Sequence, residues 1–315
     1  RKQQRNEKAE VRRIMQKRTF LRGALSAAFI LSTPFILTGC GDEKPAAAAG
    51  KPDTAKALGK TKIRVGVTAG PHADIVAKAA EVAKTHGLEV EVVEFSDYVT
   101  PDISLNDGAL DAAVYQHEPF LRNFNEQKGT KLAVAGHAVV QPMGIYSKRI
   151  HALEDIKTGA AVAIPNDPSN GGRALILCEE AGLIKLREGL KGEPLVHDIV
   201  ENPRGLRFIE LEAAQLPLSL EDVDAAFIPM NYVVSSGLSP EKDGFYFERL
   251  DAPYALIVIA AREDNVKNPE IATFVESYRS AETAAFVREK FRGTILPSWT
   301  TEKRSVDDGE KKSAS

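Results

Sequence analysis

Residues 160–175, AAVAIPNDPSNGGRAL, constrain the fold more than any other stretch of the chain. Residues 161–164 form a short apolar run, which is typical of a strand that is covered on both faces. Pro165 ends this run, and turn-forming residues then lead into ALILCEEAGL, which predicts a helix that begins near Arg173. A buried strand, a polar loop and a helix in this order are typical of an α/β protein.

The same loop carries groups that suit a small anion such as a carboxylate. It would bring together backbone N–H groups, a helix N-terminus, the amide of Asn170 and the guanidinium of Arg173. An ordinary strand-to-helix connection with a surface arginine would show the same pattern. This segment alone therefore leaves both interpretations open.

The first part of the folded chain has the pattern of a βαβ unit. Residues 62–68 and 88–95 read as strands, and the apolar positions in residues 73–86 recur with the period of a helix. Parallel strands joined by a helix are the usual result of this order. We therefore expect a sheet that is at least partly parallel.

The chain contains a weak internal echo. Residues 105–115, LNDGALDAAVY, and residues 218–228, LSLEDVDAAFI, each read as a short helix, an Asp, two alanines and a strand. The match is too weak for a sequence repeat, but two similarly built α/β lobes would produce it. Two lobes with two crossing segments, the first within residues 141–147, would leave a ligand cleft at the carboxyl ends of their strands.

The N-terminal segment predicts export and lipid attachment. Met15 is a more plausible start than Arg1, and basic residues after it precede a mostly apolar run over residues 23–37, too short and too interrupted to span a membrane. The run ends in LTGC, which resembles the bacterial lipobox. That resemblance implies cleavage before Cys40 and attachment of fatty acyl groups such as palmitate, a durable anchor. A generic secretory signal with a chance cysteine is the alternative.

These patterns divide the chain into four parts. Residues 1–39 would be an upstream segment with a lipoprotein signal peptide, and residues 40–60 a lipid anchor with a flexible tether. Residues 61–140 together with 250–315 would form lobe 1, and residues 141–249 would form lobe 2.

Composition excludes several classes of function. Residues 1–39 carry nine Lys and Arg and two Glu, so their removal would leave a net charge of −10 and make nucleic acid an unsuitable partner. Cys178 is the only cysteine besides Cys40; we expect it in the core, and an internal disulfide or a Cys-based metal site has no second thiol. The motifs G-x-S-x-G, H-E-x-x-H and C-x-x-C are absent.

Two histidine pairs and several loop residues remain as candidates for binding. His72 with Asp74 and His117 with Glu118 have metal-ligand chemistry, but loop histidines more often only form hydrogen bonds, so we expect neither a metal nor a cofactor. The remaining candidates lie at predicted strand ends: Phe95, Tyr98, Tyr115, Asn202 and Asn231. Each aromatic residue alone is more typical of packing, but together the three could wall an apolar pocket. Asn202 precedes Pro203 and could equally be a turn residue.

Seven segments, in order and nearly unbroken from about residue 62 to residue 292, carry a resemblance to a known family. They are GVTAGPHADI, VVEFSDYVTP, LDAAVYQHEPFL, AIPNDPSNGGRAL, VENPRGL, ELEAAQLPLSLEDVDAAFI and LIVIAAREDN. With the lipobox, they resemble the methionine-binding lipoprotein (NlpA-type) family, the substrate-binding components of ABC importers. The resemblance implies a type II periplasmic binding protein fold, in which two α/β lobes joined by two crossing segments close on the ligand.

The resemblance also implies roles for the site residues. Arg173 and Asn170 would hold the carboxylate of an amino acid, and Asn231 and Asn202 would add hydrogen bonds to its charged groups. Four residues would surround the side chain of the ligand: Phe95, Tyr98, Tyr115 and His117. The pattern departs from many family members at residues 229–231, PMN, because Pro229 removes an amide.

The expected function is capture of an amino acid, most of all L- or D-methionine, and its delivery to an ABC permease with its ATPase. The lipid on Cys40 would hold the protein at the cell membrane, facing the periplasm or the exterior. The same fold could bind another apolar amino acid or a short peptide. A surface adhesin with no transport role is an alternative of another class, and an enzyme is disfavoured because no nucleophile–base pair appears in the sequence.

Overall fold

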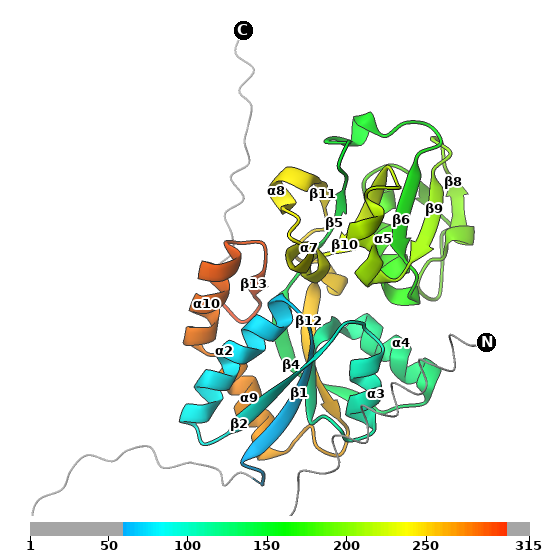
Figure 1. Ribbon diagram of the computed structural model, residues 1–315. Helices are drawn as coiled ribbons and strands as arrows, with labels where there is room; N and C mark the ends of the chain where they lie inside the picture. Colours follow the sequence, from blue (N-terminus) through cyan, green and yellow to red (C-terminus); the bar gives the residue numbers. More distant parts are fainter. Residues whose placement is uncertain (1–58, 301–315) are drawn as a thin grey trace, which may run out of the picture. The chain divides into compact units, whose positions relative to one another are not determined.

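The computed structural model describes residues 59–300, which all belong to one compact unit (Figure 1). The predicted signal peptide, Cys40, most of the tether and the last fifteen residues lie outside this range. None of the helices within residues 59–300 combines the length and the apolar character that a membrane span requires.

One sheet has six strands in the order β13-β4-β12-β3-β1-β2. Strand β1 pairs in parallel with β2 and β3, whereas β12 is antiparallel to β3 and β4. The strands are β1 (Lys62–Thr68), β2 (Glu89–Phe95), β3 (Ala112–His117), β4 (Leu132–Val140), β12 (Leu256–Arg262) and β13 (Leu296–Pro297). The helices of this first lobe are α2 (Pro71–Thr85), α3 (Thr100–Asn106), α4 (Glu118–Lys128), α9 (Pro269–Tyr278) and α10 (Ala281–Phe291).

A second sheet has five strands in the order β11-β5-β10-β6-β9. Strand β6 pairs in parallel with β9 and β10, and β5 is antiparallel to β10 and β11. The strands are β5 (Met143–Tyr146), β6 (Ala161–Pro165), β9 (Arg207–Leu211), β10 (Ala225–Pro229) and β11 (Gly244–Phe247). The helices of this second lobe are α5 (Pro168–Glu180), α6 (Leu216–Ser219), α7 (Met230–Ser236) and α8 (Pro240–Asp243), and a two-stranded ribbon adds β7 (Lys185–Leu186) and β8 (Ile199–Glu201).

The two sheets are built alike, as the internal echo predicts. The order β12-β3-β1-β2 in the first lobe corresponds to β5-β10-β6-β9 in the second, with the antiparallel strand at the same place. The echoed segments are α3 with β3 and α6 with β10. A loop and a helix follow β1, the neighbour of β3, and also β6, the neighbour of β10. The carboxyl ends of β1 and β6 therefore present loops in equivalent positions.

Several boundaries differ from the sequence-based expectation. Strand β5 occupies most of the predicted crossing at residues 141–147, because Ile145 and Tyr146 are fully buried and pair with β10. A 3-10 turn, η2 (Val196–Asp198), precedes β8, and another, η1 (Leu153–Asp155), precedes β6. The apolar run at residues 253–261 also begins with a turn, η4 (Pro253–Ala255), before β12. Strand β11 is an edge strand that the sequence reading missed.

The second lobe has its own apolar core beneath α5. Cys178 is fully buried there beside Leu175 and Ile164, which confirms its expected role as a small core residue. Helix α5 begins very close to the end of β6: a Cβ added to Gly171 would lie 2.8 Å from the carbonyl oxygen of Pro165. Only a glycine permits this approach of backbone to backbone, which sets where α5 starts.

We expect Gly171→Ala to lower the free energy of unfolding by about 1–3 kcal/mol, because the added methyl group must push α5 away from β6. Denaturant titration measures this loss. Gly192→Ala is the matched control, since a Cβ there meets nothing within 4 Å, and it should change stability by less than about 0.5 kcal/mol. Equal effects of the two substitutions would show that the close approach of α5 to β6 does not constrain the fold.

Candidate functional site

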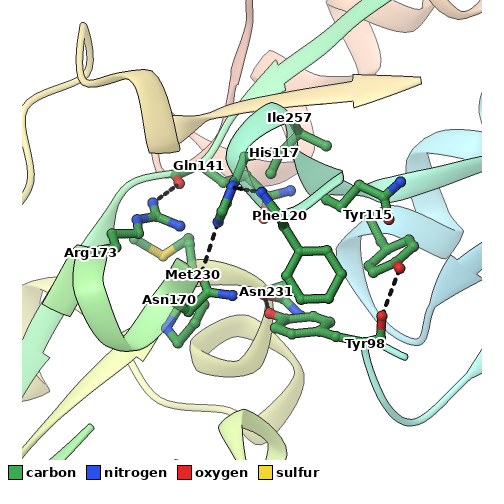
Figure 2. A pocket seen from close by; sticks show the side chains of 12 residues that line it. Tyr98, Tyr115, His117, Phe120, Gln141, Asn170, Arg173, Met230, Asn231 and Ile257 are labelled. Carbon is green, nitrogen blue, oxygen red and sulfur yellow. Dashed lines mark hydrogen bonds between the residues drawn. The ribbon is translucent and has the colours of Figure 1, made fainter. Parts of the chain in front are cut away.

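A pocket lies between the two lobes and is lined by both of them (Figure 2). About 320 Å³ in and directly around it, open solvent included, is free of protein atoms. The first lobe contributes Tyr98, Tyr115, Gln116, His117, Phe120 and Ile257; the second contributes Asn170, Arg173, Pro229, Met230 and Asn231; and Gln141 comes from the crossing between β4 and β5. Most of these residues end or follow β3, β6 and β10, so the pocket lies where parallel strands of both sheets end.

The cap of α5 fixes the polar end of the pocket. The carboxylate of Asp167 accepts hydrogen bonds from the backbone N–H of Asn170 (2.9 Å) and from its side-chain Nδ2 (3.1 Å). The backbone bond is a standard N-cap, which satisfies a helix N–H that has no other partner. Because Nδ2 is held by Asp167, the side-chain oxygen of Asn170 is directed to the other lobe.

Arg173 is 3% exposed and lies at this polar end. Its Nη2 donates to the carboxylate of Glu248 (2.6 Å) and to the carbonyl oxygen of Gln141 (2.9 Å), and its Nε also donates to Glu248 (3.1 Å). Nη1 donates no hydrogen bond to any of the residues that the structure describes. The guanidinium is therefore held along one edge and retains donors for a ligand on the other.

His117 joins the two lobes. The backbone N–H of Phe120 donates to Nδ1 of His117 (3.1 Å), so the ring proton resides on Nε2 and donates to Oδ1 of Asn170 (3.0 Å). Burial, and then the positive charge of Arg173, lowers the pKa of His117 from 6.5 to about 3. The ring is thus a neutral donor at physiological pH.

Aromatic side chains form the other end of the pocket. The rings of Tyr98 and Tyr115 are stacked with centroids 5.8 Å apart, and Phe120 meets both of them edge-on. The hydroxyl of Tyr98 donates to Oδ1 of Asn231 across the cleft (2.6 Å), and that of Tyr115 donates to the carbonyl oxygen of Tyr98 (2.6 Å; Figure 2). Burial raises the pKa of both hydroxyls, which keeps them as donors.

The pocket also contains buried amide groups that lack hydrogen-bond partners. Within residues 59–300, Nε2 of Gln141 and Nδ2 of Asn231 are buried and unpaired, as are both polar atoms of the Gln116 amide. Each such group costs about 1–3 kcal/mol when it stays unpaired. The amide hydrogens of Gln141 and Asn231 are therefore suited to a polar ligand that supplies the missing acceptors.

Comparison with known proteins identifies the family. The family model described as NlpA lipoprotein matches residues 63–299. The chain belongs to the NlpA lipoprotein family. The resemblance found in the sequence is thereby confirmed.

Relatives and solved structures of the NlpA family agree over nearly their whole lengths. A probable D-methionine-binding lipoprotein MetQ of Vibrio cholerae is 41% identical over 89% of this chain and 98% of its own length. Lipoprotein 28 of Escherichia coli is 45% identical over 75% of this chain and 88% of its own. A nutrient-binding protein of Burkholderia cenocepacia, solved with methionine bound, is 42% identical, with a TM-score of 0.73 over 75% of this chain and 99% of its own. The two-lobed periplasmic binding protein fold is therefore confirmed.

In this NlpA family member, six of the eight residues singled out in the sequence line one pocket: Tyr98, Tyr115, His117, Asn170, Arg173 and Asn231. The other two do not line it. Phe95 packs with the apolar cluster of the first lobe, and Asn202 forms a turn through hydrogen bonds to both backbone groups of Leu206 (2.8 and 2.9 Å). The turn interpretation of Asn202, left open by the sequence, describes its contacts.

The sequence reading missed half of the lining. Gln116 and Phe120 belong to the VYQHEPF run that already drew attention to His117, and Met230 directly follows β10. Gln141 directly follows β4, and a polar residue directly after a predicted strand is a useful signal for a pocket-lining residue. No set of three or more His, Cys, Asp or Glu suited to a metal ion occurs in residues 59–300.

We expect the His117 ring to remain neutral at pH 5, because its pKa is lowered to about 3. Long-range ¹H–¹⁵N NMR spectra report the tautomer, and the exposed His197 provides a reference ring in the same spectra. In the unfolded chain the ring takes up a proton near pH 6.5, so its contribution to stability is complete above that pH and is lost as the pH falls toward 3. A His117 titration midpoint near 6.5 would contradict this environment.

Proposed function

We propose that this chain is a substrate-binding protein that captures a free amino acid, methionine first, and delivers it to an ABC import permease. The observation that carries the proposal is the polarity of the pocket. Arg173 and the unpaired amide of Gln141 lie at one end, and the stacked rings of Tyr98 and Tyr115, with Asn231 beside Tyr98, lie at the other. An amino acid has the matching division into a charged backbone and a side chain.

The polar end suits the charged groups of a zwitterion. A carboxylate would accept from the Nη1 edge of Arg173 and from the free amide hydrogens of Gln141 and Asn231. Charge-assisted bonds of this kind contribute about 1.5–3 kcal/mol each. No Asp or Glu is among the lining residues, so amide and carbonyl oxygens would accept from the α-ammonium group.

The aromatic end suits a thioether. Tyr98, Tyr115 and Phe120 present ring faces and edges, and sulfur contacts with aromatic rings are favourable. The names of the relatives support methionine over other apolar amino acids or a short peptide. Identification by mass spectrometry of ligand carried through purification distinguishes these alternatives.

Contacts across the cleft explain how binding would be reported to a transporter. His117 and Tyr98 of the first lobe bond to Asn170 and Asn231 of the second, and all four line the pocket. A ligand that touches both sides would stabilise the closed arrangement over the open one. The permease would then recognise the closed, ligand-bound protein and distinguish it from the open one.

We further propose the chain layout and cellular location from the sequence. Residues 1–39 would be removed, Cys40 would carry the lipid, and residues 40–60 would tether the folded part to the membrane. Lobe 1 would span residues 61–140 with 250–315, and lobe 2 residues 141–249. The folded part would face the periplasm or the exterior.

We expect ligand-stripped protein to bind L- or D-methionine in isothermal titration calorimetry, and Arg173→Lys to weaken that binding about 10–100-fold. Lysine keeps a positive charge opposite Glu248 but loses the forked donors of the guanidinium. Asn202→Ala is the matched control: it removes a turn contact outside the pocket and should leave affinity unchanged. Absence of binding to methionine and to every other amino acid would sink the proposed function.

We expect wild-type protein expressed in a bacterial host to incorporate labelled palmitate and to partition into detergent. Cys40→Ala should abolish both properties, because the thiol is the acceptor of the lipid. Cys178→Ala is the control, since that thiol is fully buried in the second lobe. Labelling that persists in Cys40→Ala would exclude the proposed anchor.

A further inference from the structure

We propose that Glu248 makes the pocket selective for ligands of zero net charge, by acting as the fixed counter-ion of Arg173. The guanidinium then offers directed donors to a carboxylate without leaving an excess positive charge in the site. This inference rests on the proposed function, capture of a free amino acid. It adds a residue that does not line the pocket and yet determines which ionic form of a ligand fits.

The pairing of Glu248 with Arg173 is buried and uses several bonds. The carboxylate of Glu248 accepts from both Nε and Nη2 of Arg173, at 2.6–3.2 Å, and the two side chains are 6% and 3% exposed. A buried charge without a partner is strongly disfavoured. Arg173 therefore requires an anion in the protein, and Glu248 supplies it behind the guanidinium.

The position of Glu248 is fixed by the crossings between the lobes. The backbone N–H of Met143 donates to its carboxylate (3.0 Å), and its own backbone N–H donates to the carbonyl oxygen of Met143 (2.9 Å). Met143 follows the first crossing, and Glu248 begins the return toward η4 and β12. The carboxylate cannot turn toward the pocket without breaking these bonds.

The other ionisable groups near the pocket do not replace this counter-ion. The lining residues include no Asp, Glu or Lys, and His117 is neutral. Asp167 is occupied by hydrogen bonds from Ser169 and Asn170, and Asp102 is completely buried below Tyr115. Any negative charge that these two acids keep adds to the effect of Glu248 and disfavours a ligand with a net negative charge.

The charge balance distinguishes two forms of one ligand skeleton. Methionine is a zwitterion with no net charge, so its binding leaves the Arg173–Glu248 pair balanced. 4-(Methylthio)butanoate keeps the carboxylate and the thioether but lacks the ammonium group, and it adds an unbalanced negative charge to a buried site. Removing the charge of Glu248 reverses the preference for methionine over the anion. The guanidinium is then an unbalanced positive charge, which attracts a carboxylate and repels an ammonium group.

Isothermal titration calorimetry with these two compounds tests the inference through the ratio of their dissociation constants. We expect Glu248→Gln to lower the ratio of 4-(methylthio)butanoate to methionine at least tenfold, equivalent to about 1.4 kcal/mol. A purely structural role would weaken both compounds alike and leave the ratio unchanged. Glu241→Gln is the matched control: Glu241 carries the same charge and lines, with Glu248 and Phe247, a groove outside the binding pocket, and its side chain is bonded to Ser239 instead of Arg173.

The outcomes separate this inference from the proposed function. Wild-type protein that binds methionine, with a ratio changed less than threefold in Glu248→Gln, overturns the inference alone. Wild-type protein that binds neither compound overturns the inference, and it overturns the proposed function as well if it binds no other amino acid. If Glu248→Gln fails to fold, the double variant Arg173→Gln, Glu248→Gln decides: recovered folding shows that an unpaired buried guanidinium caused the failure, and a double variant that stays unfolded overturns the pairing.

Discussion

The structure around the pocket depends on how one buried guanidinium distributes its hydrogen bonds. Arg173 begins no strand and ends no helix, yet it contacts Glu248 near the second crossing, the carbonyl oxygen of Gln141 in the first, and the pocket itself. A charged group so far from water is stable only when it is paired with an opposite charge and hydrogen-bonded. The same requirement ties the helix that carries Arg173 to both connections between the lobes.

The placement of that guanidinium begins with local chemistry in the loop before α5. Pro165 ends β6, Asp167 caps the helix, and Gly171 lets its first turn approach the strand. These three features determine where Asn170 and Arg173 project. The loop that first suggested an anion site therefore lines one side of the pocket, and aromatic residues of the first lobe line the other.

Local patterns in the sequence predicted the local structures well. The strand, loop and helix around Pro165 and the echo that becomes β3 and β10 follow from hydrophobic periodicity and turn residues, which act over a few positions. The partner of Arg173 could not be predicted in this way, because Glu248 lies 75 residues away and no spacing rule connects them. Asn202 shows a second limit of local patterns. An Asn before a proline occurs both in turns and in binding loops, so the sequence could not distinguish the two roles.

Tyr98 both lines the pocket and holds the lobes together through Asn231. One side chain therefore contributes to two properties that are usually discussed apart, the shape offered to a ligand and the time for which the lobes stay shut. A change that reshapes this wall for a different side chain also alters the rate of opening. A substitution of Tyr98 therefore cannot change the ligand preference without also changing the rate of ligand release.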